Sequence, residues 1–217
     1  MIQIDDAGSG SFVGGTCIGF LRPETNEYYY GIIPVELYDK QNFRKKLYLE
    51  AVVDIAKEAF SVLGVRRGEW IQLCRGYMFE KLKKWLDDEN HTYCCMHITG
   101  KMQEAVEKNF ELYAMTLGLP ESYIKYTRYP FHFHKLLRWV YADYENRIHS
   151  CKIGWKSWSK LENMPSKSAF ARMEVPNVYC LKCGEKIGIG EEIKIISFVS
   201  NKTQYVITHR CCPVSLV

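Results

Sequence analysis

Three short apolar segments open the chain, and each is bounded by residues that favour turns. The first, Met1–Ile4, stops at Asp5-Asp6, and a Gly/Ser loop separates it from the second, Phe12–Leu21. The third, Tyr28–Leu37, is rich in aromatic and β-branched residues. Segments of this length and composition predict three β-strands joined by short connections. Pro34 has no backbone N–H to donate, so the third strand should lie at a sheet edge or carry a bulge.

The hydrophobic period changes after these strands. Apolar residues recur at helical spacing over Phe43–Leu63, which predicts a helix that ends at Gly64. Strand-like segments at 69–74 and 92–98 then alternate with helical patterns at 78–86 and 102–117. The predicted order is therefore β-β-β-α-β-α-β-α. This order implies an α/β fold in which a mixed sheet carries helices on its faces.

The rest of the chain divides into three stretches. Residues 119–160 have a helical pattern and are expected to form an appendage that completes a first domain, 1–160. Residues 161–175 mix Pro, Ser and charged residues without any period, which is typical of a linker. Residues 176–217 would then form a small C-terminal module.

Composition and charge narrow the class of protein. Of the 217 residues, 47% are hydrophobic and 25% charged, which is ordinary for a globular protein, and the net charge of +4 permits contact with nucleic acid without requiring it. No cationic segment followed by an apolar one opens the chain, and no apolar run approaches the ~20 residues of a membrane span. We therefore expect a cytoplasmic protein without a membrane partner, whose nine cysteines stay reduced.

Four of these cysteines crowd into the C-terminal module. Cys180 and Cys183 are separated by two residues, so both thiols can bind one ion, and Gly184 permits the tight turn behind them. Two alternating segments follow, which predict a hairpin, and then His209 and Cys212 supply a second ligand pair, with Cys211 as the alternative to Cys212. The segment resembles zinc-ribbon and treble-clef modules. Four ligands leave no open position, so the spacing predicts a structural zinc site without catalysis.

A second group of candidate residues lies in the first 117 residues. Asp5-Asp6 ends the first predicted strand and precedes a Gly/Ser loop, and Glu50 lies in the apolar run Leu49–Val53. A Gly-containing turn at Gly100-Lys101 precedes a helix that carries Glu107 and Glu111. In element order and in these local motifs, the segment resembles the ribonuclease H-like superfamily. The resemblance implies that Asp5 or Asp6, Glu50 and Glu107 or Glu111 hold catalytic Mg²⁺ or Mn²⁺.

The sequence departs from that family at two positions. The fourth strand should end in an acid, but Arg75 follows it, and Phe110 stands where the last acid is expected. A guanidinium stays charged and would repel a second divalent ion, although Arg75 or Lys101 could hold a backbone phosphate. We therefore expect a nucleic-acid-binding or nucleic-acid-processing protein with at most weak metal-dependent phosphodiester hydrolysis. The alternative is a catalytically inactive protein-interaction module of the same fold, with a structural zinc site.

Overall fold

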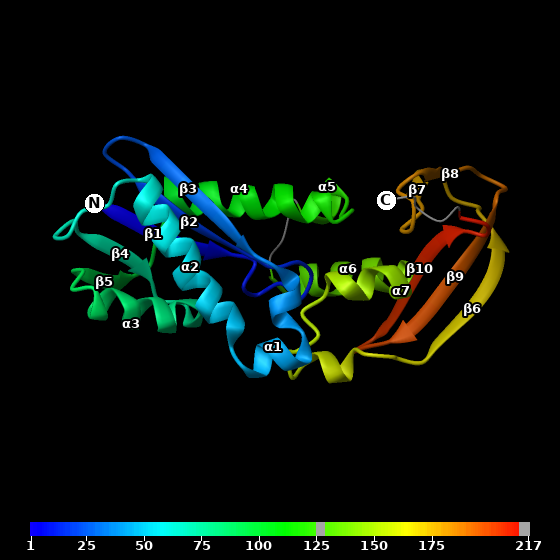
Figure 1. The fold of residues 1–217 in the computed structure, drawn as a ribbon. Coiled ribbons are helices and arrows are strands. Elements are labelled where there is room, and N and C mark those ends of the chain that lie inside the picture. The colour runs from blue at the N-terminus through cyan, green and yellow to red at the C-terminus, as the bar shows by residue number, and fades with distance from the viewer. Residues whose placement is uncertain (125–128, 213–217) are drawn as a thin grey trace. The chain divides into compact units, whose positions relative to one another are not determined.

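The computed structural model describes residues 1–124 and 129–212, and the chain divides into two compact units (Figure 1). Unit 1 comprises Met1–Leu117 and Ser150–Trp155, and unit 2 comprises Gly118–His149 and Lys156–Val217. The division differs from the one expected from the sequence. The helical region after residue 117 belongs with the C-terminal module, and only a short segment returns to unit 1.

Unit 1 is built on a five-stranded mixed sheet. Its strands lie in the order β3-β2-β1-β4-β5, in which β1, β2 and β3 are antiparallel neighbours and β1, β4 and β5 are parallel neighbours. The predicted α/β class is confirmed. The strand bounds are β1 Ile2–Ala7, β2 Thr16–Arg22, β3 Glu27–Ile33, β4 Ile71–Cys74 and β5 Tyr93–Met96.

Helices cover both faces of this sheet. Alternate residues of β2 therefore pack into two separate cores. Ile18 and Phe20 pack into a core shared with α2 and α3, whereas Cys17 and Leu21 pack with Met102 and other residues of α4. Strand β2 is therefore buried on both sides and shows no polar alternation. The helix bounds are α1 Lys40–Arg44, α2 Leu47–Val62, α3 Glu80–Asp88 and α4 Lys101–Thr116.

Two boundaries differ from the expected ones for local reasons. The single helix predicted over Phe43–Leu63 is two helices, α1 and α2, because Lys46 between them adopts the left-handed conformation with φ of 58°. The third strand ends at Ile33 and not at Leu37, since Pro34 starts a 3-10 helix over Val35–Tyr38. The backbone at Lys46 leaves no trace in the hydrophobic period, so the break could not be read from the sequence.

Unit 2 combines helices with small sheets. Strands β6, β9 and β10 form an antiparallel sheet in the order β10-β9-β6, and β7 pairs with β8. Helix α6 contacts β10, and Tyr141 of α6 stacks on Phe198 of β9 at 4.2 Å between ring centroids. The bounds are α5 Glu121–Ile124, α6 Tyr129–Ala142, α7 Tyr144–Arg147, β6 Ser166–Arg172, β7 Val178–Tyr179, β8 Lys186–Ile187, β9 Glu192–Val199 and β10 Thr203–His209.

The segment 161–175, expected to be an irregular linker, contains strand β6. All seven residues of β6 are exposed, so the strand buries no face and shows no alternation of apolar and polar residues. Its strand conformation comes from pairing with β9 along the whole of Ser166–Arg172. Pairing of this kind depends on a partner distant in sequence and carries no local signal.

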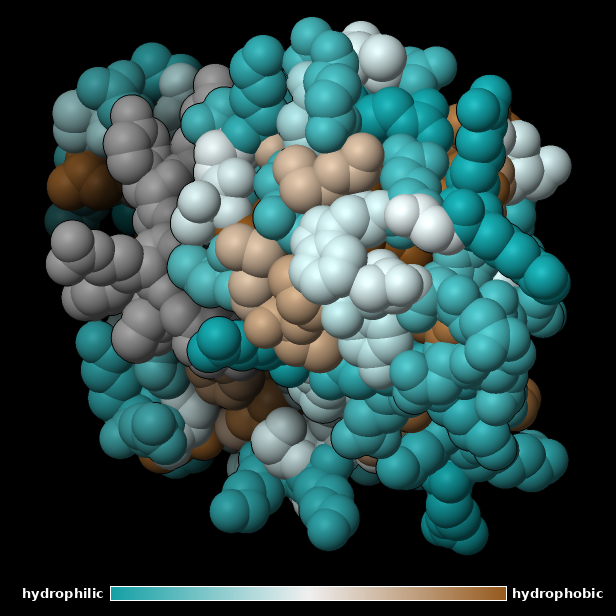
Figure 2. Space-filling view, turned by 90° about the vertical axis from the view of Figure 1, so that its left-hand side faces the viewer, coloured by the Kyte–Doolittle hydropathy of each residue, from teal (hydrophilic) through white to brown (hydrophobic). Residues whose placement is uncertain are grey.

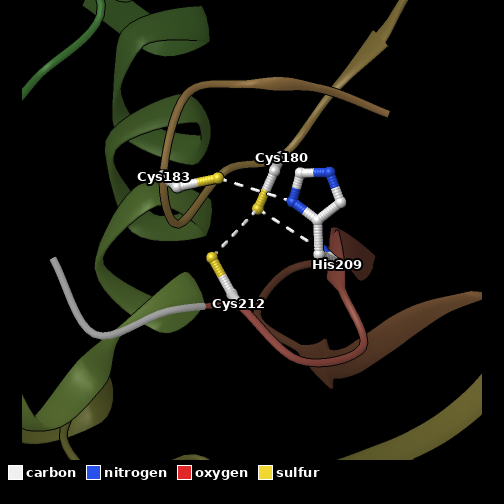
Figure 3. Close-up of side chains that lie close together, drawn as sticks. All are labelled: Cys180, Cys183, His209 and Cys212. Carbon is white, nitrogen blue, oxygen red and sulfur yellow. Dashed lines mark hydrogen bonds between the residues drawn. The ribbon is translucent and has the colours of Figure 1, made fainter. Parts of the chain in front are cut away.

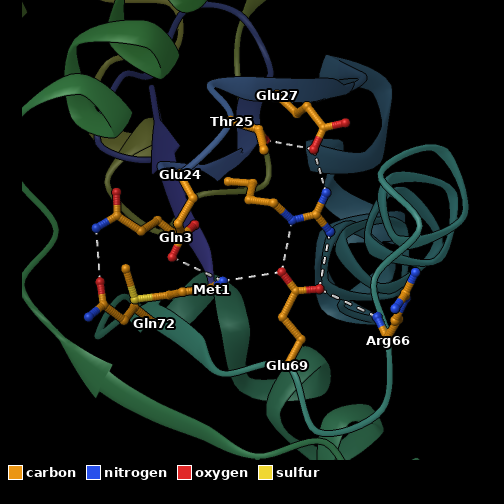
Figure 4. A network of polar contacts seen from close by, with 9 residues as sticks. Met1, Gln3, Glu24, Thr25, Glu27, Arg66, Glu69 and Gln72 are labelled. Carbon is orange, nitrogen blue, oxygen red and sulfur yellow. Dashed lines mark hydrogen bonds and ion pairs between the residues drawn. The ribbon is translucent and has the colours of Figure 1, made fainter.

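An ion-pair network joins β2 to the loop before β4 in unit 1 (Figure 4). Arg22 donates from Nε and Nη2 to the two carboxylate oxygens of Glu69 at 2.9 and 3.1 Å, and it also pairs with Glu27. Hydrogen bonds from Arg22 are the main reason that the pKa of Glu69 is lowered to about 2. Both side chains of the Arg22–Glu69 pair are only 16% exposed, so solvent weakens this pair less than a surface pair.

We expect Glu69→Gln to destabilise the protein at neutral pH and not in acid. The pKa of Glu69 is lower when folded than when unfolded, so its stabilisation is present above about pH 4.5 and disappears as the pH falls toward about 2. The loss should be about 1–2 kcal/mol at pH 7, measured by urea unfolding, and should shrink at pH 3. Glu89→Gln, which removes an exposed pair with Arg67, is the control. A pH-independent difference would contradict this account.

Hydrophilic side chains cover most of one face of the molecule (Figure 2). On the face shown in Figure 2, hydrophilic side chains predominate, and apolar colour is confined to small areas among them. Within residues 1–124 and 129–212, no helix is long and apolar enough to cross a membrane.

Candidate functional site

The central strand of unit 1 carries the two aspartates that the sequence singled out. Strand β1 lies between β2 and β4, and it continues through Asp5 and Asp6 to Ala7 instead of stopping before them. Asp5 is 7% exposed, and its pKa is raised because burial disfavours the charged form. Asp5 and Asp6 therefore lie within the sheet, near the carboxyl end of its central strand.

The neighbouring strand brings a cysteine beside them. Strands β1 and β4 are parallel, with Gln3 opposite Gln72, and the two amides hydrogen bond at 2.9 Å. Side chains two residues further along lie on the same face, which places Cys74 beside Asp5. The ligand atoms of Asp5, Asp6 and Cys74 all lie within 4.8 Å of one another.

This geometry corrects the expectation for the fourth strand. The side chain that lies beside the aspartates belongs to Cys74 and not to Arg75. Cys74 is the last residue of β4, and the register with β1 places it next to Asp5. Arg75 instead donates from Nε to the carbonyl oxygen of Cys95 at 3.4 Å. Burial, with the hydrogen bond to Asp5, raises the pKa of the Cys74 thiol to about 12, so the metal-free thiol is protonated and a poor nucleophile at neutral pH.

A buried lysine supports the loop that follows β1. Lys152 is 0% exposed, and its Nζ donates to the carbonyl oxygen of Gly8 at 2.6 Å and to Thr16 Oγ1 at 3.1 Å. The ring of Tyr38 lies 4.6 Å from the ammonium. Burial lowers the pKa of Lys152 to about 7, and the charge of Asp6 opposes that shift. No feature of the sequence identified this lysine, which is 144 residues from Gly8.

The pKa of Asp6 is shifted in the opposite direction to that of Lys152. Burial raises the pKa of Asp6 to about 6, and the charge of Asp5 adds to the rise. Hydrogen bonds from Ser9 and the charge of Lys152 favour the carboxylate and limit the shift. The end of β1 is thus an acidic position whose charge is balanced from inside the protein.

Helix α4 contributes less to this site than the sequence implied. Phe110 packs against Gly8, where the room is so small that an added Cβ would lie 2.1 Å from its ring. Glu107 influences the charge of Asp5, and it accepts a hydrogen bond from Gln103 at 2.9 Å. Glu111 pairs with Lys108 at 3.7 Å on the helix surface.

Glu50 and Lys101 take part in other contacts. Glu50 lies on the exposed side of α2 and pairs with Lys81 of α3, although the residues around it in sequence are apolar. Lys101 donates to Asn26 Oδ1 at 3.2 Å. Among the described residues, the potential metal-binding group in unit 1 consists of Asp5, Asp6 and Cys74, and Glu50 is not part of it.

Unit 2 holds a second group with a different donor set (Figure 3). Cys180, Cys183, His209 and Cys212 place one ligand atom each within 4.8 Å of all the others. The Sγ atoms of Cys180 and Cys212 are 3.7 Å apart, and Cys183 Sγ lies 3.4 Å from His209 Nδ1. Of the two cysteines considered for the fourth position, the structure selects Cys212, and Cys211 is exposed. The cluster could hold a metal ion such as zinc.

Backbone contacts fix the two halves of this cluster. Cys180 ends the segment after β7 and His209 ends β10, and the N–H of Leu181 donates to Ile207 of β10 at 3.1 Å. Burial disfavours the Cys180 thiolate, but N–H groups of Cys183, His209 and Lys182 more than offset it and lower its pKa to about 7. A thiolate of this kind is the form that binds a metal.

A half-buried arginine holds the turn that contains Cys180 and Cys183. Arg147 of α7 donates to the carbonyl oxygens of Leu181 and Lys182 at 2.8 and 2.7 Å, and its guanidinium lies 4.2 Å from the ring centroid of Trp139. Lys182 also pairs with Asp143 at 3.1 Å. The helical segment therefore positions the first ligand pair, a role that the sequence did not reveal.

Comparison with known proteins identifies no family. No family model matches the chain, and no curated protein matches it. Among solved structures, the chain is similar to one in the cryo-electron microscopy structure of a simian T-cell lymphotropic virus intasome in complex with the PP2A regulatory subunit B56 gamma. The identity is 9%, the TM-score is 0.35, and the similarity covers 98% of this chain and 78% of that chain. A TM-score of this size supports no statement about function.

Proposed function

We propose that this protein binds nucleic acid, with a ribonuclease H-like unit 1 and a structural zinc ion in unit 2. The resemblance noted in the sequence is supported by a five-stranded mixed sheet whose central strand carries Asp5 and Asp6 beside a Gly/Ser loop. The Cys/His cluster has four donors and thus a complete tetrahedral set for zinc. Its role is then to hold the C-terminal module together.

The charge of the two units supports the choice of ligand. Unit 2 contains fourteen Lys and Arg residues and eight Asp and Glu residues, whereas unit 1 contains fifteen and seventeen. The modest net charge of the whole chain therefore conceals a basic unit and a slightly acidic one. A basic surface attracts the phosphate backbone without regard to sequence.

One surface of the β10-β9-β6 sheet carries the proposal. Phe170 of β6 is 62% exposed and lies opposite Lys194 of β9, and the guanidinium of Arg210 is 5.1 Å from the centroid of its ring. Arg172 lies two residues further along β6, and Glu192 pairs with both arginines. This group, which we name the Phe170 patch, combines an exposed aromatic ring with three cations. Such a combination suits single-stranded nucleic acid, whose bases stack while its phosphates bind cations.

Hydrolysis by unit 1 is expected to be weak or absent. Two-metal cleavage of a phosphodiester needs several carboxylates, and the end of β4 supplies the thiol of Cys74 in place of one. Glu50, another acid that the resemblance implies, pairs with Lys81. Brisk Mg²⁺-dependent cleavage of single-stranded, duplex or hybrid substrates that disappears in Asp6→Asn would contradict this expectation.

Binding of labelled single-stranded DNA and RNA tests the proposal. We expect Phe170→Ala to weaken binding by about 1–3 kcal/mol, because one stacked base loses its platform. Removal of Arg172 or Arg210 should reduce the slope of log affinity against log salt by about 0.7 for each phosphate contact that is lost. Fluorescence anisotropy over a series of salt concentrations measures both effects.

Two controls match these substitutions. Tyr205→Ala removes an equally exposed ring from the opposite face of the same sheet and should leave binding unchanged. The pair Arg67→Glu and Lys84→Glu changes exposed charge in unit 1 and should alter binding little. Absence of binding at low salt would instead favour the protein-interaction alternative, which the exposed apolar residues of unit 2 also suit.

A further inference from the structure

We propose that Asp5, Asp6 and Cys74 bind one divalent transition-metal ion of borderline softness, such as Zn²⁺ or Co²⁺. The three ligand atoms lie within 4.8 Å of one another, a separation that one ion can bridge. They are carried by β1 and β4, adjacent parallel strands in the middle of the sheet, and so are held by rigid elements. The inference concerns unit 1 alone and does not depend on nucleic-acid binding.

The donor set determines the class of metal. A sulfur ligand favours Zn²⁺, Co²⁺ and related ions, whereas Mg²⁺ requires hard oxygen ligands and keeps much of its water. With Cys74 at the place where a further carboxylate would complete an oxygen site, Mg²⁺ loses a ligand and a thiophilic ion gains one. The preference is therefore opposite to the one that the resemblance in sequence implied.

The charge balance limits the site to one ion. Binding deprotonates Cys74, whose proton passes to solvent as the sulfur–metal bond forms, so the three ligands together carry three negative charges. One divalent ion balances two of these three charges. A second divalent ion would leave an excess of positive charge in a partly buried place.

Two of the three ligands are partly exposed to solvent. Asp6 and Cys74 keep part of their surface exposed, so an ion can reach them. His97, which follows β5, and Glu107 of α4 both influence the charge of Asp5. Among the described residues, the group that could hold an ion is confined to Asp5, Asp6 and Cys74, so water is the available source for the remaining coordination positions.

Metal content of the full-length protein tests the inference. The protein is kept reduced, saturated with Co²⁺ and desalted, and zinc and cobalt are then summed by elemental analysis. We expect two transition-metal ions per chain, one in each unit, and one in Cys74→Ser. A sulfur-to-cobalt charge-transfer band assigned to unit 1 should persist in Cys180→Ser and disappear when Cys74→Ser is added. A large excess of Mg²⁺ should not displace the ion.

Matched variants separate loss of a ligand from loss of the fold. Cys94→Ser changes a free, half-buried cysteine of β5 and should retain both ions. Asp5→Asn removes a ligand by a different change and should also lower the content to one. Circular dichroism checks that each variant is folded. An equal metal content in the parent protein and in Cys74→Ser, or displacement by Mg²⁺, would each overturn the proposal.

Discussion

Replacing Cys180 with serine should remove one zinc ion per chain and unfold the C-terminal module. Cys180 is 1% exposed, and its sulfur lies 3.7 Å from that of Cys212 and accepts N–H groups of Lys182 and His209 at 3.4 Å each. With Met173, Ile187 and Ile193 it forms a small cluster of four buried side chains, too few to stabilise the module alone. Structural zinc supplies about 10–16 kcal/mol in small modules, so loss of the ion should abolish folding of this part.

Elemental analysis and amide hydrogen exchange measure the two consequences. Protection of β7, β8 and the ends of β9 and β10 should collapse together with the zinc content, while the sheet of unit 1 stays protected. Cys211→Ser changes the adjacent, exposed cysteine and should retain both zinc and protection. If Cys180→Ser kept its full zinc content, the cluster would not be the zinc site.

Replacing Lys152 with alanine should destabilise unit 1 by about 2–5 kcal/mol, because a fully buried side chain is lost and two hydrogen-bond acceptors lose their donor. The substitution leaves the carbonyl oxygen of Gly8 and the hydroxyl of Thr16 without this donor. It also removes the cation that favours the Asp6 carboxylate, so the pKa of Asp6 should rise further. The expected structural effect is a loosened connection between β1 and β2.

Urea unfolding of the parent protein and three variants separates these contributions. Lys152→Met restores most of the buried volume without the charge and should recover part of the stability that Lys152→Ala loses. Lys156→Ala, four residues away and exposed, should change stability little. Equal stability of Lys152→Ala and the parent protein would show that the contacts of Lys152 contribute nothing net.

The sequence predicted the features that depend on local pattern. The order of strands and helices in residues 1–117 followed from hydrophobic period, and the Cys180–Cys183 and His209–Cys212 spacings predicted the four members of the Cys/His cluster. Strand β6 escaped prediction because all of its residues are exposed and its conformation depends on β9. The left-handed backbone at Lys46 escaped for a similar reason, since no residue type marks it.

The candidate site of unit 1 was only half predictable. Asp5 and Asp6 could be found because they end an apolar run, but the identity of their neighbour depends on the register between β1 and β4. A shift of one residue in that register exchanges the faces of Cys74 and Arg75, and a single sequence does not fix it. Glu50 was a candidate because its neighbours in sequence are apolar, but its own side chain is exposed on α2.

The return of Ser150–Trp155 to unit 1 affects how the protein is made. Once residues 1–117 have emerged from the ribosome, every strand of the five-stranded sheet is present. The carbonyl oxygen of Gly8 and the N–H of Gly14 still lack their partners, Lys152 and Ser150. At about 5–20 residues per second, those partners follow a few seconds later, after part of unit 2 has emerged. Chaperones would thus meet a nascent sheet whose acidic site is the last part to close, and a fragment cut at residue 117 would keep it in that state.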